Sequence, residues 1–287
     1  MIQPTRRSLV LTAAALAACS PKTPVATASP NTIEAAVAGS WRTPSERARD
    51  PWRHPVESLQ FWGLKPHQTV VEFWPGAGWY TDILAPFLAA TGGRLYVANM
   101  QPDPADPAAG AVAEALRHHL MEKPRLFGEV TLTAFGPTSG PVAPAGSADL
   151  VLFLRNLHNW MAAGLAEKAF RDAYLALKPG GLLGVEEHRA NSGGVPDLLA
   201  ADGYVHQAFA IKLAQEAGFR LAAESEINAN PRDTKDHPFG VWTLPPVRRS
   251  SPRGQADNPK FDHAPYNAIG ESDRMTLRFI KPADALP

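Results

Sequence analysis

The sequence of 287 residues contains a single cysteine, Cys19, and has no long apolar run beyond its first residues. One thiol excludes an intramolecular disulfide and a cysteine-rich metal site. The 28 lysines and arginines balance the 28 aspartates and glutamates, so the chain lacks the basic excess with which nucleic-acid-binding proteins attract phosphates. Nucleic acid is therefore not an expected partner. Its content of 45% hydrophobic and 20% charged residues is typical of a globular chain with enough apolar material for a core.

The first 19 residues have the layout of an export signal. Arg6 and Arg7 precede an apolar run over residues 8–18, which is too short to span a bilayer as a stable helix. The stretch TRRSLVL resembles the twin-arginine signal, which exports folded proteins, and LAAC resembles a bacterial lipobox, in which the cysteine is lipidated. We expect a protein exported to the periplasm or cell envelope and anchored to the membrane by lipid on Cys19. An ordinary cleaved signal with an incidental cysteine is the alternative.

The rest of the chain is predicted to be a short tether followed by one domain. Residues 20–40 are rich in proline, alanine, serine and threonine, which predicts a flexible tether. In residues 41–287, apolar β-forming runs alternate with helical patterns, which predicts an α/β fold with parallel strands. Strands are expected at residues 69–73, 93–100, 129–135, 148–154, 182–187, 220–227 and 274–280. The proline-rich insertion at 228–273 is expected to be a substrate lid or a surface loop.

A glycine-rich turn follows the first predicted strand in the stretch VVEFWPGAGWYTDIL. Such a turn directs backbone N–H groups and the positive end of a helix toward one point, and its glycines let a ligand approach the backbone. Gly76 and Gly78 lack the third glycine of a dinucleotide fingerprint, and the Lys-Ser/Thr pair of a P-loop is missing. A tight turn without a ligand is the alternative, because two glycines at this spacing are a weak signal.

The same turn resembles the acid-x-Gly-x-Gly-x-Gly turn of class I S-adenosylmethionine-dependent methyltransferases. The stretch LKPGGLLGVEE is similar to the motif before their fifth strand, and RNLHNW resembles a segment of quinone-biosynthesis C-methyltransferases. Over residues 49–282 the chain resembles a group of exported bacterial predicted methyltransferases of undefined substrate. The resemblance implies a Rossmann-like class I methyltransferase fold, with a seven-stranded, mostly parallel sheet and helices on both faces. It also implies methyl transfer from S-adenosylmethionine to a small-molecule or envelope acceptor.

The resemblance further implies a cofactor site, in which the turn would lie against the methionine end of S-adenosylmethionine. The expected cofactor-binding residues are Glu72, Trp74, Pro75, Gly76, Gly78 and Asn99. Trp74 stands where the family has its first glycine. Asn99 replaces an acid that takes the ribose hydroxyls, and it offers one acceptor oxygen without charge. These departures keep a second interpretation open, a methyltransferase-like envelope protein that binds another ligand or a metal. No metal site is predicted, because no metal-binding motif or close histidine pair is present.

Polar residues that follow the fourth and fifth predicted strands are expected to meet, because ligands of open α/β sheets bind beyond the carboxyl ends of the strands. Methyl transfer to oxygen or nitrogen needs alignment and removal of a proton. We predict His158 as the catalytic base, with His188 as the second candidate and Glu187 as an orienting partner. The alternative is that His158 and Asn159 only form hydrogen bonds to neighbouring loops and hold them. The expected substrate-binding residues are Arg53, His54, Arg155, Asn156, Asn159, Trp160 and Arg189. Residues 271–274 are expected to be a charged loop closure in which the adjacent acid and base pair locally.

Overall fold

The computed structural model describes residues 29–104, 107–193 and 195–283. The predicted export signal, Cys19 and the first part of the predicted tether lie outside these ranges. Within them, no helix is both long enough and apolar enough to cross a membrane.

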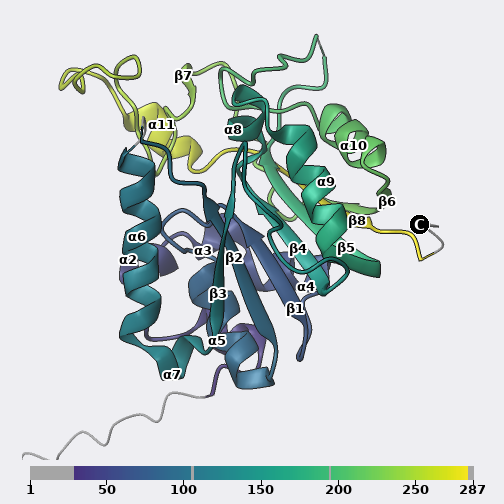
Figure 1. The fold of residues 1–287 in the computed structure, drawn as a ribbon. Coiled ribbons are helices and arrows are strands. Elements are labelled where there is room, and N and C mark those ends of the chain that lie inside the picture. Colours follow the sequence, from purple (N-terminus) through teal and green to yellow (C-terminus); the bar gives the residue numbers. More distant parts are fainter. Residues whose placement is uncertain (1–28, 105–106, 194, 284–287) are drawn as a thin grey trace, which may run out of the picture.

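A seven-stranded sheet forms the centre of the fold, in the order β3-β2-β1-β4-β5-β8-β6 (Figure 1). Its strands are β1 (Thr69–Phe73), β2 (Arg94–Met100), β3 (Val130–Phe135), β4 (Ala148–Leu154), β5 (Leu177–His188), β6 (Arg220–Ser225) and β8 (Arg274–Ile280). The first five strands pair in parallel, whereas β8 lies antiparallel to both β5 and β6. The predicted seven-stranded, mostly parallel sheet is confirmed.

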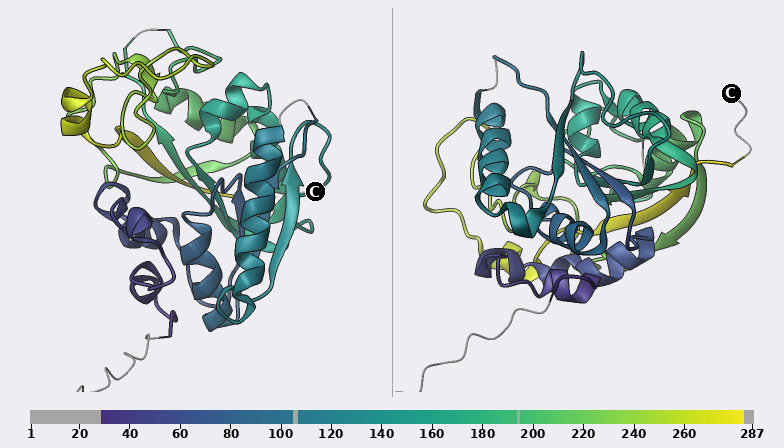
Figure 2. Two further views of the ribbon diagram at one scale, coloured as in Figure 1. Left: turned by 90° about the vertical axis from the view of Figure 1, so that its left-hand side faces the viewer. Right: turned by 60° about the horizontal axis from the view of Figure 1, so that its bottom comes forward.

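Helices cover both faces of the sheet, which gives three layers (Figures 1 and 2). They are α1 (Ile33–Val37), α2 (Pro44–Arg47), α3 (Asp50–Arg53), α4 (Pro55–Trp62), α5 (Thr81–Thr91), α6 (Pro107–Glu122), α7 (Pro124–Phe127), α8 (Leu157–Ala162), α9 (Ala166–Ala176), α10 (Gln207–Glu216) and α11 (Ala264–Ile269). One apolar cluster joins α8, α9 and α10 to the sheet. A second joins α1, α4, α5, α6 and α7 to the opposite face.

The strand sequences explain the two clusters. In β1, Val71 and Phe73 belong to the first cluster and Val70 to the second, because successive side chains of a strand point to opposite faces. Strands covered on both faces need apolar residues at every position, which accounts for their continuous apolar runs. Gly184 in β5 lets Trp62 of α4 lie directly against the sheet, since a Cβ at this position would fall 2.5 Å from Trp62 Cγ.

Two local predictions are wrong. Part of the predicted tether folds as α1, whose Ile33 and Ala36 are buried, because these two apolar residues pack against α4 and α5. The segment LKPGG does not precede the fifth strand but forms its beginning, since β5 starts at Leu177.

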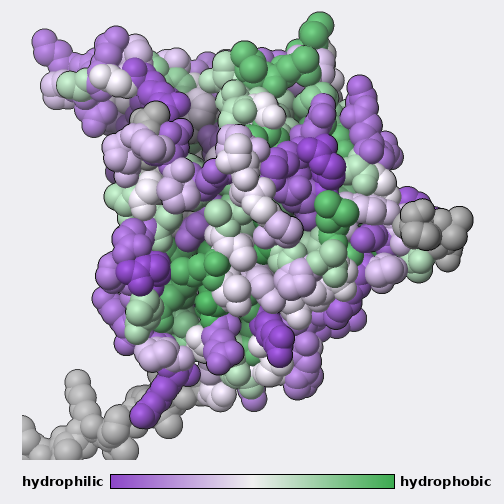
Figure 3. All heavy atoms as spheres, viewed as in Figure 1, coloured by the Kyte–Doolittle hydropathy of each residue, from purple (hydrophilic) through white to green (hydrophobic). Residues whose placement is uncertain are grey.

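The insertion at 228–273 contains β7 (Pro238–Val241) and α11. It lies over the end of the sheet at which β4 and β5 finish, at the top of Figure 1. The loop between β5 and α10 lies at the same end and exposes the apolar side chains Val195, Leu198 and Leu199. Figure 3 shows apolar surface along this upper edge, whereas most of the remaining visible surface is mixed or polar. The carboxyl ends of the parallel strands are therefore covered by long connections, as expected for a ligand-binding edge.

Candidate active site

The glycine turn between β1 and α5 needs left-handed backbone at several positions. Trp74, Gly76 and Gly78 have φ angles of 44°, 60° and 89°, and the Gly78 N–H donates to the Pro75 carbonyl at 3.0 Å. A Cβ added to Gly76 would meet no atom within 4 Å, whereas one on Gly78 would lie 2.6 Å from Leu116 Cδ1. Gly76 therefore presents open backbone to the solvent side of the turn, and Gly78 permits close packing of α6 against it.

A cavity of about 460 Å³ opens at this turn. Its lining residues are Trp74, Gly76, Asn99, Met100, Val112, Ala113, Asn156, Asn159, Ala162, Ala163 and Arg253. Residues of the turn and residues at the ends of β2 and β4 thus line one cavity. The volume of this cavity suits a small-molecule ligand. Of the predicted cofactor residues, Trp74, Gly76 and Asn99 line this cavity, together with two residues predicted to contact substrate, Asn156 and Asn159. The open backbone at Gly76 and the three amide side chains fit S-adenosylmethionine.

Glu72 lies beneath the turn rather than in the cavity wall. Its carboxylate accepts a hydrogen bond from Thr81 Oγ1 at 2.7 Å. Burial raises the pKa of Glu72 to about 7, although the hydrogen bond from Thr81 opposes this shift. In this structure the carboxylate therefore links β1 to the start of α5.

Trp74 forms a wall of the cavity and extends toward β3. Its indole Nε1–H donates to the Phe135 carbonyl at 2.9 Å, and its ring packs edge-on against Trp160 at 5.8 Å between centroids. Trp160 itself is fully buried and packs on Phe73 and Phe153. Trp160 was predicted to contact substrate. The structure instead places its indole in the aromatic core between α8 and the sheet.

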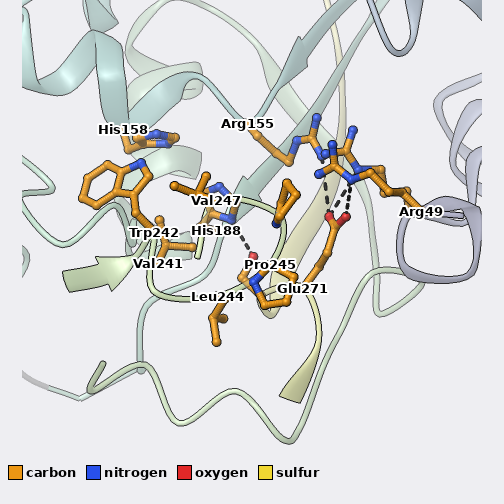
Figure 4. Close-up of a pocket in the computed structure, with 13 residues that line it drawn as sticks. Arg49, Arg155, His158, His188, Val241, Trp242, Leu244, Pro245, Val247 and Glu271 are labelled. Atoms are coloured by element: carbon orange, nitrogen blue, oxygen red, sulfur yellow. Dashed lines mark hydrogen bonds and ion pairs between the residues drawn. The ribbon is translucent and has the colours of Figure 1, made fainter. Parts of the chain in front are cut away.

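A second cavity, of about 280 Å³, lies on the other side of the first turn of α8 (Figure 4). It shares no lining residue with the first cavity. Its lining residues are Arg49, Arg53, Arg155, His158, His188, Val241, Trp242, Leu244, Pro245, Pro246, Val247, Glu271 and Ser272. Residues 241–247 of the insertion thus contribute an apolar wall to this cavity, and the role of the insertion as a lid or a surface loop stays a prediction.

His158 and Glu187 form a buried dyad at this second cavity. His158 Nδ1 lies 2.9 Å from Glu187 Oε1, and the carboxylate also accepts the backbone N–H groups of His158 and His188 at 3.2 and 2.7 Å. Because Nδ1 faces a carboxylate, the neutral ring carries its proton on Nδ1 and keeps Nε2 as an acceptor. Glu187 is therefore an orienting partner of His158, and the dyad has the arrangement of a general base.

His188 lies beside this dyad, with its ring centroid 5.2 Å from that of His158. His188 Nδ1 is 2.6 Å from Ser272 Oγ. Burial, followed by the neighbouring His158 and arginines, lowers the pKa of His188 well below its ordinary value of 6.5. His188 is therefore neutral near pH 7.

The lowered pKa of His188 predicts a pH-dependent stability. A histidine that binds fewer protons when folded makes the free energy of unfolding fall as the pH drops below about 6.5. We expect the wild type to be destabilised more than the His188→Gln variant on going from about pH 7 to about pH 5. The opposite contribution of Glu72, whose pKa is raised to about 7, is common to both proteins and cancels in the comparison. Urea unfolding at both pH values measures the difference, with His118→Gln at an exposed histidine as the control. An equal loss in the wild type and in His188→Gln would contradict this reading.

The structure brings together a histidine pair that sequence spacing did not reveal. Donor atoms of His158, Glu187 and His188 all lie within 4.8 Å of one another. Two imidazoles and a carboxylate are ligands that divalent transition metals accept. The prediction of no metal site therefore remains untested, and its argument that no close histidine pair exists is wrong.

Glu271 stands at the opposite end of the second cavity and faces several arginines (Figure 4). Its carboxylate lies 2.6 Å from Arg49 Nε, 3.2 Å from Arg53 Nε and 3.3 Å from Arg274 Nη1. Arg155 Nη1 is 3.9 Å away. Within residues 271–274, Glu271 pairs locally with Arg274. The predicted pair of the adjacent acid and base is wrong, because Asp273 pairs with Arg189 and Arg274 also pairs with Glu186.

The remaining residues predicted to bind substrate lie elsewhere. His54 lines a separate cavity, and its Nδ1 lies 3.4 Å from Asn228 Oδ1. Arg189 pairs with Asp273 at 2.9 Å and with Glu226 at 2.7 Å, which raises its pKa above the ordinary range. Arg189 therefore links the ends of β5, β6 and β8 through these ion pairs. It lines neither of the two cavities.

Comparisons with known proteins bear on the fold. No protein-family model and no curated protein sequence matches this chain. The [4+2]-cyclase SpnF has 15% sequence identity and a TM-score of 0.54, over 85% of this chain and 83% of that one. A candidate sarcosine dimethylglycine methyltransferase from Galdieria sulphuraria has 13% identity and a TM-score of 0.52, over 83% and 88% of the two chains. A chain from the complex between a Haloferax volcanii methyltransferase activator and a candidate methyltransferase has 13% identity and a TM-score of 0.50, over 88% and 98%.

The strand order, the glycine turn after β1 and these likenesses define the fold. The chain has the Rossmann-like fold of class I S-adenosylmethionine-dependent methyltransferases.

Proposed function

We propose that the protein is an S-adenosylmethionine-dependent methyltransferase whose cofactor occupies the cavity at the glycine turn. The observation that carries this proposal is the open backbone of Gly76 in a cavity that also includes Asn99 and Asn156, at the carboxyl ends of β1, β2 and β4. Asn99 would take the ribose hydroxyls with its amide, and the turn would face the methionine end. When bound, S-adenosylmethionine supplies an electrophilic methyl group on its sulfonium.

In this proposal the acceptor occupies the second cavity and its nucleophile reaches past the first turn of α8 toward the first cavity, because in-line transfer needs the nucleophile about 3 Å from the methyl carbon. His158 would act as the base that takes the proton of this nucleophile. The acceptor is a small molecule or envelope component with a hydroxyl or amino group. Glu187 fixes the ring of His158 with Nε2 free to accept a proton, and it stabilises the imidazolium that then forms. Trp242 packs edge-on against His158, with 5.9 Å between ring centroids. The insertion thereby excludes water from the base.

The proposal keeps the predicted place of the protein in the cell envelope, with a lipid anchor on Cys19. Its support is the sequence of the first 19 residues. The exposed apolar loop between β5 and α10 suits a surface near lipid or an apolar acceptor. Export of a folded chain through the twin-arginine route would let the protein leave the cytoplasm with its cofactor already bound.

Calorimetric titration with S-adenosylmethionine and S-adenosylhomocysteine tests the cofactor site. We expect micromolar binding to the wild type and a loss of about 100-fold or more in Gly76→Val, because the side chain displaces the ligand from its productive place. Gly146→Val is a matched control. Gly146 has a φ of 63°, close to the 60° of Gly76, and a Cβ there also meets open space, but it lines neither cavity.

The control separates backbone strain from loss of the ligand site, because both variants force a branched residue into left-handed backbone. Equal binding by Gly76→Val and wild type would contradict the position of the cofactor. Absence of binding to the folded wild type up to millimolar ligand would contradict the methyltransferase proposal as a whole.

A further inference from the structure

Four arginine side chains surround two carboxylates at the end of the second cavity opposite His158. Arg274 Nη1 pairs with Glu186 at 2.8 Å and shares Glu271 with Arg49 and Arg53. Arg155 is the fourth arginine. Guanidinium groups stay protonated in proteins. Even with both carboxylates ionised, the cluster therefore keeps two positive charges without a counter-charge.

Two other acids lie near the cluster but not within it. The Glu187 carboxylate lies at the His158 end of the cavity, where it accepts from His158 and two backbone N–H groups. Glu72 lies in the field of Arg155, but it is buried beneath the glycine turn and bonded to Thr81. The positive charge is therefore concentrated at the arginine end, although these two carboxylates, when ionised, offset it over the cavity as a whole.

Three of the four arginines have a buried N–H group that no described residue accepts: Arg53 Nη1, Arg155 Nη1 and Arg274 Nε. The side chains of Arg53 and Arg155 line the cavity. The side chain of Arg53 is only 3% exposed. Buried donors without an acceptor are costly and rare in folded proteins, so each calls for a partner.

The free donors are held in place rather than left to move. Glu271 fixes Arg53 through Nε, and the guanidinium of Arg53 stacks on Trp79 with Cζ 4.6 Å from the ring centroid. Arg155 has a left-handed φ of 59°, and its backbone N–H donates to the Glu186 carbonyl at 2.7 Å. Rigid, correctly placed donors are the condition for tight binding of an anion.

We infer that the acceptor carries a carboxylate or phosphate group, which Arg53 and Arg155 bind at one end of the cavity while the reacting hydroxyl or amine lies at His158. The guanidinium fork matches both oxyanions. This inference rests on the proposed function for the identity of the ligand as the acceptor. Figure 4 shows the arginines at one end of the cavity and His158 at the other, with Val247 between them. This separation sets the order of groups along the acceptor. An anionic end is followed by an apolar body and then by the nucleophile.

The methionine carboxylate of the cofactor is the competing source of an anion. Against it, the arginines line the second cavity only, and Arg253 supplies the charge in the wall of the first. The experiment must therefore separate an anion of the acceptor from that of the cofactor.

Nuclear magnetic resonance titration of the full chain with inorganic phosphate, and separately with acetate, tests the inference at constant ionic strength. Arg155→Gln should weaken binding of the preferred anion by about 10- to 100-fold, the effect of losing a hydrogen bond to a charged group. Arg278→Gln is the matched control, because Arg278 donates to the Phe61 carbonyl and stacks on that ring away from both cavities. Stronger binding of phosphate than acetate would identify a phosphate monoester, and the reverse a carboxylic acid.

The same titrations are repeated with S-adenosylhomocysteine present. An acceptor site predicts that the anion binds with unchanged affinity and that Arg155→Gln keeps its affinity for S-adenosylhomocysteine. Competition between the two ligands, or weaker S-adenosylhomocysteine binding by Arg155→Gln, would overturn the inference in favour of the cofactor carboxylate. No anion binding by the folded wild type would also overturn it. Anion binding without any S-adenosylhomocysteine binding would support the anion site and contradict only the proposed function.

Discussion

Replacing Glu271 with glutamine should lower the free energy of unfolding by about 3–5 kcal/mol, the cost of removing one partner from a buried ion pair. Its carboxylate contacts Arg49, Arg53 and Arg274 at 2.6–3.3 Å, and the side chain is 7% exposed. A neutral amide leaves these guanidinium groups with Glu186 as their remaining counter-charge, and they cannot release their protons. Because Arg49 is 25% exposed, solvent screens part of the repulsion, and the lower end of this range is expected.

Chemical denaturation with urea measures this effect. Glu114→Gln is the control, since Glu114 pairs with Arg117 on the exposed face of α6 and its loss should leave the unfolding midpoint unchanged. Phosphate should restore part of the stability of Glu271→Gln, because an anion that binds only the folded state stabilises it. Equal midpoints for Glu271→Gln and Glu114→Gln would show that the arginines do not depend on Glu271.

Replacing His158 with glutamine should reduce kcat by about 10²- to 10⁴-fold, the usual contribution of a general base. Glutamine can still donate to Glu187 but cannot take a proton from the acceptor. Affinity for S-adenosylmethionine should stay unchanged, because His158 lines the acceptor cavity and not the cofactor cavity. The measurement is transfer of a labelled methyl group to an acceptor found by screening acids and phosphate monoesters that carry a hydroxyl or amino group.

His119→Gln is the matched control for this substitution. His119 Nε2 lies 2.8 Å from Asp82 Oδ1, so it resembles His158 in having a carboxylate partner, but it lies outside both cavities. A similar kcat in His158→Gln and His119→Gln would remove His158 from the chemical step. It would assign the dyad to holding β4 and β5 together.

The strands of the sheet were predicted well, because the apolar runs that define them are local features of the sequence. Strands β1, β4 and β8 were predicted with their observed bounds, since continuous apolar runs ending at turn residues define buried strands. The helix α1 was missed because its composition is that of a tether, and only contact with α4 and α5 orders it.

The candidate site was predicted in part, for a similar reason. His158, His188 and Glu187 follow two neighbouring strands, so topology alone indicated that they meet. The arginine end was largely missed, because Arg49 and Glu271 lie more than 200 positions apart in the chain and pair only through the folded sheet. Asp273 and Arg274 are adjacent in sequence, but Asp273 pairs with Arg189 and Arg274 pairs with Glu186. These partners lie far away in the chain.

The position of β8 has a consequence for the order of events in folding. It lies between β5 and β6 although it follows both in the chain, so β6 cannot join the sheet until β8 has been inserted. Glu271 and Ser272 directly precede β8, and the insertion wall precedes them. Non-local pairings of this kind form late because loop closure must come first. We therefore expect the second cavity, whose wall includes Glu271 and Ser272, to be assembled late in folding, only after β8 has left the ribosome.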